Sequence, residues 1–257
     1  VQNHLELRFD VASVSKLFTS VAVLQQVGHG ALDLDAPLDR SVDLRGTSLR
    51  TDVTLRQLLL HTSGIADIAD EERGEDYADV FRQHPCHVVT TTRDFLPLFA
   101  GKPANFPPGT TRRYCNAGYV LAGLAVEEVT GRPFREYVEA DILGPAGMTR
   151  SAYLDKRYAH PDLAEGYDPG DHGRLEQNIY AYPPIGAPDG GAHCTAGDLL
   201  RFLDALRADI LLPGELRELF FTPQVPIDDE TSQGFGLQFT EDCWWKEGRS
   251  EGASAIL

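Results

Sequence analysis

Positive charge is scarce in this chain. Of its 257 residues only 23 are Lys or Arg, against 39 Asp or Glu, so the formal net charge is -16. Nucleic acids and anionic membrane surfaces are bound through basic residues, so this balance excludes both as expected partners. No apolar run approaches the roughly 18 residues that a membrane-spanning helix needs, and we therefore expect no membrane span.

Cysteine is equally sparse, and the spacing of the four cysteines forms no C-x-x-C pair and suggests no disulfide framework. The sequence does not open with a positively charged stretch followed by an apolar stretch, so no signal peptide is visible. Together these two absences favour a cytoplasmic over a secreted location. His84, Cys86 and His87 bring potential metal ligands together, but no second cluster completes a site. We expect a surface turn there, and no metal.

The apolar pattern predicts an α+β fold. Apolar residues three or four apart predict helices over 10–26, 116–130 and 133–143, and capping residues predict two more, after Thr54 and after Thr195. Strand-like patterns fall at 234–239 and 253–257, whereas 66–108 and 155–188 read as largely irregular. Helical patterns thus fill the middle of the chain and strand patterns collect at the ends, which favours a helical part inserted between sheet-forming segments.

Ser13 and Lys16 form an S-x-x-K motif near a predicted helix start. Residues three apart lie on one helix face, so the two side chains can reach each other. A serine hydroxyl becomes a good nucleophile only when a nearby base takes its proton. The helix N-terminus adds free N–H groups that can face a developing oxyanion. Lysine occurs only four times in the chain, which adds weight to Lys16, although an exposed helix lysine would satisfy the same spacing.

Two further short patterns carry acid–base or binding groups. Tyr114 and Asn116 stand at the start of the predicted helix 116–130, where a tyrosinate can act as a general base and an amide can orient a lysine or a carbonyl. Lys246 lies in the C-terminal strand region, and Gly248 beside it permits close approach. Each pattern alone is equally compatible with packing or with an exposed edge-strand lysine.

In chain order, these patterns resemble the S-x-x-K, Y-x-N and K-T-G signature of serine β-lactamases and penicillin-binding proteins. The sequence around these motifs extends the resemblance to nearly the whole chain. The matching segments are Val11–Thr19, Leu55–Gly64, Tyr114–Tyr119 and Gly190–Leu199. The resemblance is closest to class C β-lactamases, D-Ala-D-Ala carboxypeptidases and family VIII esterases.

The resemblance implies a β-lactamase/transpeptidase-like fold, with an antiparallel sheet flanked by helices and a mainly helical lobe. Residues 1–45 and 186–257 would form the sheet-containing lobe, with the nucleophile helix at the interface, and 46–185 the helical lobe. The implied activity is that of a serine hydrolase acting through an acyl-enzyme on a small-molecule or peptide substrate: a short-chain ester, a β-lactam or a D-Ala peptide. No cofactor is implied, and the oligomeric state stays open.

The same resemblance implies a role for each matching residue. Ser13 would attack the carbonyl carbon, and Lys16 and Tyr114 would share the proton transfers, with Tyr114 as the favoured base. Asn116 would orient the site and Lys246 would line its far wall. The remaining oxyanion contact would come from the backbone N–H of Arg249, which follows Gly248 and acts together with that of Ser13.

The chain departs from the family pattern in two ways. Glu247 stands where β-lactamases carry Thr or Ser. The family also has two strands before the nucleophile helix, and more strands and a helix after the third motif, whereas here about a dozen residues precede Ser13 and nine follow Gly248. We therefore expect that the terminal segments of the family fold either lie outside this sequence or are absent from an abbreviated protein, whose sheet would then be incomplete.

Two other interpretations stay open. Gly248-Arg249-Ser250-Glu251-Gly252 matches the G-x-S-x-G elbow of α/β-hydrolases, but that fold needs an acid and a histidine after the serine, and none follows Gly252. A strand turn explains these glycines better. The second alternative is a penicillin-recognising sensor or scaffold that kept the fold and lost turnover.

Overall fold

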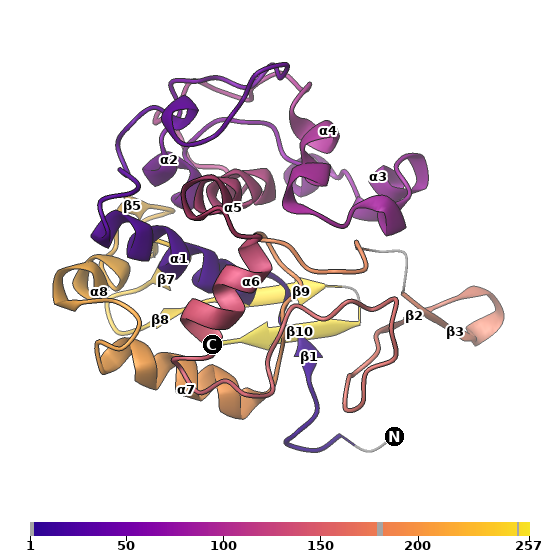
Figure 1. The fold of residues 1–257 in the computed structure, drawn as a ribbon. Coiled ribbons are helices and arrows are strands. Elements are labelled where there is room, and N and C mark those ends of the chain that lie inside the picture. Colours follow the sequence, from indigo (N-terminus) through magenta and orange to yellow (C-terminus); the bar gives the residue numbers. More distant parts are fainter. Residues whose placement is uncertain (1–2, 179–181, 251) are drawn as a thin grey trace.

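The computed structural model describes residues 3–178, 182–250 and 252–257. Helices and short antiparallel strands are largely segregated along the chain, with most helices before residue 140 and most strands after residue 165, which confirms the α+β prediction (Figure 1). The α-helices are α1 (Lys16–Gly28), α2 (Leu55–Leu59), α3 (Tyr77–Gln83), α4 (Leu96–Phe99), α5 (Asn116–Thr130), α6 (Phe134–Val138), α7 (Ala196–Arg207) and α8 (Gly214–Phe220). Shorter helical turns are η1 (Ala12–Ser15), η2 (Leu38–Arg40), η3 (Glu71–Arg73), η4 (Cys86–Val88), η5 (Thr92–Phe95), η6 (Glu139–Leu143, a π-helix) and η7 (Asp171–Gly173).

The strands that the structure describes are short, and each pair of named strands is antiparallel. β5 (Val225–Pro226), β6 (Ser232–Gln233), β7 (Gln238–Phe239) and β8 (Trp244–Trp245) form a four-stranded sheet in sequence order. Three two-stranded units complete the set. They are β1 (Phe9–Asp10) with β4 (His193–Cys194), β2 (Tyr167–Pro169) with β3 (Leu175–Gln177), and β9 (Glu247–Ser250) with β10 (Ala253–Ile256).

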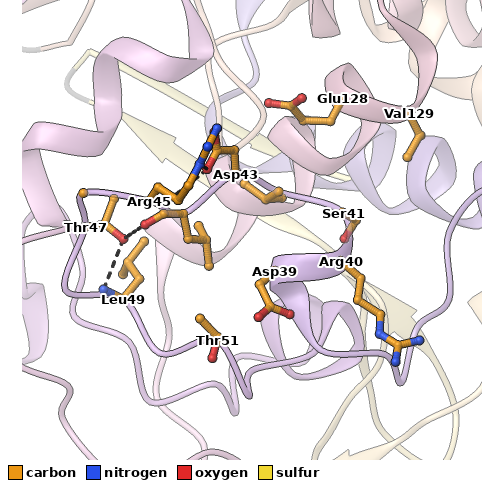
Figure 2. A pocket seen from close by; sticks show the side chains of 13 residues that line it. Asp39, Arg40, Ser41, Asp43, Arg45, Thr47, Leu49, Thr51, Glu128 and Val129 are labelled. Atoms are coloured by element: carbon orange, nitrogen blue, oxygen red, sulfur yellow. Dashed lines mark hydrogen bonds and ion pairs between the residues drawn. The ribbon is translucent and has the colours of Figure 1, made fainter.

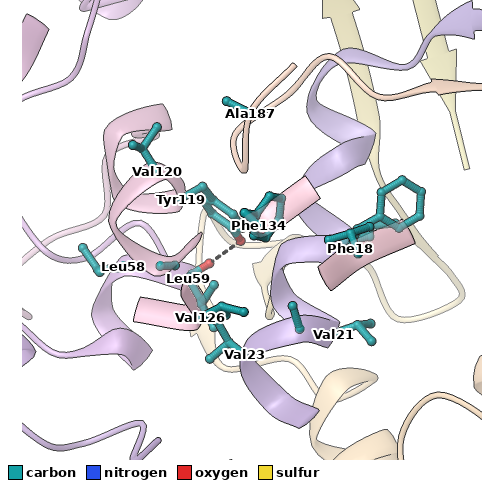
Figure 3. Close-up of a cluster of buried hydrophobic side chains, with 14 of the residues drawn as sticks. Phe18, Val21, Val23, Leu58, Leu59, Tyr119, Val120, Val126, Phe134 and Ala187 are labelled. Carbon is teal, nitrogen blue, oxygen red and sulfur yellow. Dashed lines mark hydrogen bonds between the residues drawn. The ribbon is translucent and has the colours of Figure 1, made fainter. Parts of the chain in front are cut away.

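Helix α1 runs through the centre of the molecule, packed against α5 (Figure 1). Its fully enclosed apolar side chains include Leu17, Phe18, Val21 and Leu24, and burying each such side chain contributes about 1.5–3 kcal/mol. Leu58 and Leu59 of α2 and Val120 and Val126 of α5 extend the same cluster, as Figure 3 shows. Tyr119 belongs to it as well, and its hydroxyl donates to the Leu59 carbonyl at 2.8 Å. Helices α1 and α5, which begin at the candidate site residues Lys16 and Asn116, are thus fixed by a common core.

Helix-capping patterns located several elements correctly. Helix α5 has the predicted bounds, and Gly131 follows it with φ of 66°. Thr54 caps α2 in a reciprocal capping box with Gln57. At α7 only half of such a box forms. Thr195 accepts from the Asp198 N–H, while the Asp198 carboxylate accepts from the Ser151 hydroxyl instead.

Other elements differ from the sequence-based expectation. The predicted strand 234–239 is wrong over its first four residues, because Gly236 has φ of 88° and the Gly234 N–H bonds the Leu237 carbonyl, making a turn between β6 and β7. The predicted helix 10–26 begins later, with Asp10 in β1 and a 3-10 turn ahead of α1. Helices α3 and α8 and the β2–β3 hairpin were not predicted.

Helices α2 to α6 fall between residues 46 and 185, together with the β2–β3 hairpin. The division into a sheet-containing lobe and a helical lobe stays a prediction. Across the described ranges, no helix is both long and apolar enough to cross a membrane.

Candidate active site

Ser13 lies in the 3-10 turn η1 that leads directly into α1, and Lys16 is the first residue of that helix. Ala12, just before Ser13, has φ of 43°, and its N–H is held by the Asp10 carboxylate at 2.7 Å. Left-handed backbone at a residue other than glycine is uncommon and clusters at functional sites. The turn leaves Ser13 half-exposed between buried neighbours, so its hydroxyl is reachable while its backbone is fixed.

The Ser13 hydroxyl takes part in two short hydrogen bonds. Its Oγ lies 2.6 Å from the Tyr114 hydroxyl and accepts from Lys16 Nζ at 2.9 Å. The first bond joins residues 101 positions apart in the sequence. The structure therefore brings the S-x-x-K motif and the tyrosine together, as the family resemblance implies. A proton can pass between Ser13 and Tyr114 without movement of either side chain.

Lys16 is buried, and its ammonium group is fully used as a donor. Besides Ser13 it donates to Asn116 Oδ1 at 2.7 Å and to the backbone carbonyl of Asp189. An ammonium group has three protons, one for each of these acceptors, and it has no lone pair with which to take a proton. In this arrangement Lys16 is a donor toward Ser13, and Tyr114 is the neighbour that can accept the serine proton.

The Asn116 amide is held at both ends, which fixes its orientation. Its Oδ1 faces Lys16, and its Nδ2 donates to the Tyr77 hydroxyl at 2.6 Å. The backbone of Asn116 is held as well, because its N–H and that of Ala117 both donate to the Asp67 carboxylate at 2.8 Å. A carboxylate satisfies the free N–H groups that begin α5 and suits the positive end of its dipole. Burial nevertheless raises the pKa of Asp67.

Lys246 immediately precedes β9 and is buried, with Nζ 5.3 Å from the centre of the Tyr114 ring. Lys16 Nζ lies 5.1 Å from the same ring centre. Burial, followed by the charges of Lys16 and Arg112, lowers the pKa of Lys246 well below its usual value. Positive charge is therefore costly at this position, and a negative charge developing on the Tyr114 ring would offset that cost.

Gly248 packs directly against the nucleophile turn. A Cβ atom here would lie 2.1 Å from the Val11 carbonyl oxygen and 3.0 Å from the Ser13 backbone nitrogen, a space that only glycine fits. Lys246 and Leu257 exchange both backbone hydrogen bonds, at 2.9 and 3.0 Å. Because paired and unpaired positions alternate in an antiparallel ladder, the Arg249 N–H is directed away from β10. The side chains of Arg249 and Glu247 are exposed.

Three residues of the site were not found from the sequence: Asp67, Tyr77 and Asp189. Asp189 is buried, its carboxylate accepts from the Tyr182 hydroxyl at 2.9 Å, and burial raises its pKa to about 6. None of the three lies in a motif with chemical meaning. Two of them were nevertheless close to a segment that resembles the family: Asp67 lies three residues after Leu55–Gly64, and Asp189 immediately precedes Gly190–Leu199.

The alternative nucleophile Ser250 and a hollow on the surface both lie apart from the site around Ser13. Ser250 ends β9 and pairs with Ala253, and Gly252 has φ of 74°, so the G-x-S-x-G match coincides with a hairpin turn. A surface hollow is lined by residues from 39 to 51 together with Glu128 and Val129, and it contains none of the predicted site residues (Figure 2). Three of its charged side chains are paired: Arg45 with Asp43, and Glu128 with Arg93.

Comparisons with known proteins agree with this geometry. A family model described as Beta-lactamase matches residues 2–255. A D-aminopeptidase of Cereibacter sphaeroides is 32% identical over 237 residues, covering 90% of this chain and 42% of the relative. Esterase EstB of Burkholderia gladioli is 31% identical over 260 residues, covering 89% of this chain and 65% of the relative. The chain thus spans about half the length of these curated relatives.

Among solved structures, the penicillin-binding protein of Bacillus halodurans superposes with a TM-score of 0.95 at 36% identity. That match covers 100% of this chain and 79% of the other. The similarity therefore extends over the whole arrangement of helices and strands, and the predicted fold is confirmed.

Proposed function

Since the chain belongs to the beta-lactamase family, we propose that it is a serine hydrolase that forms an acyl-enzyme at Ser13. One observation supports this above the others: the Ser13 hydroxyl is hydrogen-bonded to both Tyr114 and Lys16, at 2.6 and 2.9 Å. A nucleophile, a neighbour able to accept its proton and a cation to hold the hydroxyl in place are the parts that acyl transfer requires.

In the proposed reaction, Ser13 Oγ bonds to the carbonyl carbon of an ester or amide while its proton moves to the Tyr114 oxygen. Tyr114 accepts this proton as a phenolate, and positive charge on Lys16 and Lys246, whose Nζ atoms lie 5.1 and 5.3 Å from its ring centre, would favour that form. The carbonyl oxygen becomes an oxyanion, which the N–H groups of Ser13 and Arg249 would stabilise. The proton then passes from Tyr114 to the leaving alcohol or amine, and water releases the acyl group by the same steps in reverse.

The substrate is proposed to be a neutral short-chain ester in preference to a penicillin. Glu247 occupies the position where β-lactamases carry a hydroxyl that reaches toward the substrate carboxylate. A glutamate there places like charge near that carboxylate, at a cost of around 1 kcal/mol or more if the pocket is partly desolvated. The names of two relatives, an esterase and a D-aminopeptidase, are in keeping with an ester or amide substrate.

The experiment for the proposed activity combines labelling with turnover. The protein is incubated with a fluorophosphonate, and the modified residue is mapped by mass spectrometry, with Ser13→Ala as control. We expect modification at Ser13 alone, and label on Ser250 or Ser15 with Ser13 untouched would overturn the proposal. An acyl-enzyme that forms and is never released would instead support the sensor alternative.

Substrate preference needs a separate measurement. Values of kcat/KM for p-nitrophenyl acetate or butyrate are compared with that for a chromogenic cephalosporin, in the parent chain and in Glu247→Thr. We expect the ester to be preferred in the parent chain, and the cephalosporin to gain in the variant. If the cephalosporin is already preferred and Glu247→Thr changes nothing, Glu247 does not face the substrate.

A further inference from the structure

His61 stands in the motif His61-Thr62-Ser63-Gly64, which none of the steps above uses. It follows α2, and only 1% of the residue is exposed. Its backbone is left-handed, with φ of 60°, a conformation that histidine tolerates better than most residues but that still costs free energy. The chain therefore holds a buried imidazole at a strained position close to the reactive group.

Three contacts connect His61 to the segment that carries Tyr114. The Arg113 N–H donates to the His61 carbonyl at 2.9 Å, and the Cys115 N–H donates to His61 Nδ1 at 3.1 Å. Between them, the Tyr114 ring packs on the imidazole with its centre 4.5 Å away. His61 thus holds the residue before Tyr114, the residue after it and the aromatic ring itself.

The proton state of His61 follows from these contacts. Because Nδ1 accepts a hydrogen bond, the neutral ring carries its proton on Nε2. Burial, and then the charges of Lys246, Arg112 and Lys16, lower the pKa of His61 well below its usual value. Protonation of Nδ1 would break the hydrogen bond from the Cys115 N–H. The backbone around Tyr114 therefore keeps this contact only while the His61 ring is neutral.

His61 Nε2 is buried without a hydrogen-bond partner among the residues that the structure describes. An unsatisfied buried N–H is unfavourable, and a phenylalanine could fill the same space without it. What phenylalanine lacks is the Nδ1 acceptor. The cost of the unpaired Nε2 is therefore explained by the other ring nitrogen, Nδ1, which accepts from the Cys115 N–H beside Tyr114.

We propose that His61 is the positioning residue for the Tyr114 base. As a neutral ring it fixes the Tyr114 hydroxyl against Ser13 Oγ, and it does so without adding a positive charge to those of Lys16, Lys246 and Arg112. The proposal rests on the proposed function, because it assigns His61 an effect that passes through the Tyr114 hydroxyl. It therefore predicts that the effect of changing His61 disappears when that hydroxyl is absent.

The variant His61→Asn tests the contribution of the imidazole ring separately from that of the backbone conformation and of the Nδ1 acceptor. Asparagine tolerates left-handed backbone and keeps an acceptor near the position of Nδ1, but it has no face to pack on Tyr114. We expect the burst rate of acylation by p-nitrophenyl acetate to fall about tenfold, and by less than about twofold when the same change is made in a Tyr114→Phe background. The ester concentration that gives a half-maximal burst rate should change little, because the proposal places His61 against Tyr114 and not against the substrate.

His193→Asn is the matched control. His193 is also buried, and its Nδ1 has no hydrogen-bond partner within the described part of the chain, but it lies in β4, where it pairs with Asp10. Any loss caused by general damage to the core should be equal in the parent and Tyr114→Phe backgrounds. Equal losses for His61→Asn in the two backgrounds, or no loss in either, would overturn the proposal. A parent chain whose Ser13 is never modified would instead overturn the proposed function.

A measurement on the unmutated side chain covers the case in which His61→Asn does not fold. In histidine labelled with ¹⁵N, His61 should show protonated Nε2 and unprotonated Nδ1 near neutral pH, and its signals should shift in Tyr114→Phe. A doubly protonated ring, or signals unchanged by Tyr114→Phe, would contradict the positioning role.

Discussion

The buried carboxyl group of Asp189 should make the protein less stable as the pH rises from acid to neutral. Its pKa rises from 3.8 to about 6 because burial penalises the charged form more than Lys16 stabilises it. Below about pH 4 the group is protonated in both the folded and the unfolded chain. Between pH 4 and 6 the unfolded chain loses the proton while the folded chain keeps it, so the free energy of unfolding decreases.

The magnitude follows from the size of the shift. A pKa about two units above the unfolded value corresponds to roughly 3 kcal/mol of lost stability, fully present above pH 6. Asp189→Asn removes the charge and keeps an oxygen that can accept from the Tyr182 hydroxyl. We therefore expect the variant to be more stable than the parent by up to roughly 3 kcal/mol at pH 8, and by almost nothing at pH 4.

Urea unfolding followed by circular dichroism at several pH values between 4 and 8 measures this difference. Asp35→Asn is the control with the opposite sign, because the hydrogen bond from Arg56 lowers the pKa of Asp35, an exposed group. That change should destabilise slightly at neutral pH and not stabilise. A gain for Asp189→Asn that is the same at pH 4 and pH 8, or a loss at pH 8, would refute the reasoning.

Three other variants test the site. Tyr114→Phe should lower kcat by about a hundredfold or more, the scale of general acid–base catalysis, with an unchanged melting temperature, and near-normal turnover would transfer the base role to Lys16. Gly248→Ala should abolish labelling of Ser13, because its Cβ would lie 2.1 Å from the Val11 carbonyl oxygen; normal labelling would show that β9 can move aside. Asp67→Ala should cost about 1–2 kcal/mol in urea unfolding by removing the acceptor that caps α5, and an unchanged midpoint would mean that water replaces it.

The sequence was informative where the relevant geometry is local. Ser13 and Lys16 are three residues apart in a helical turn, so their contact follows from helix geometry alone. Asn116 and Tyr114 stand at the start of a helix whose bounds the apolar pattern predicted. The joint order of the motifs then indicated that these local pairs meet in space, although no single motif did so.

The parts that could not be predicted depend on contacts across the fold. Asp67 caps a helix that begins 49 residues later, and the Asp189 carbonyl accepts from Lys16 across 173 residues, so neither has a local signature. The strand error at 234–239 arose because an alternating pattern does not reveal the positive φ of Gly236. Helix α8 did carry a usable signal, since Pro213 precedes Leu216, Leu219 and Phe220 at helical spacing.

Gly248 of the β9–β10 hairpin packs directly against the Val11 carbonyl and the Ser13 nitrogen. The hairpin and the turn that carries Ser13 are therefore held in place by each other. The hairpin cannot detach without removing a wall of the reactive centre, so the rate of Ser13 labelling reports on the local opening of residues 246–257. In mild urea that rate should fall before the secondary structure of the α1–α5 core is lost, since short hairpins open at lower free energy than buried helices. A single labelling reagent would then measure the stability of the chain's last strands separately from that of its core.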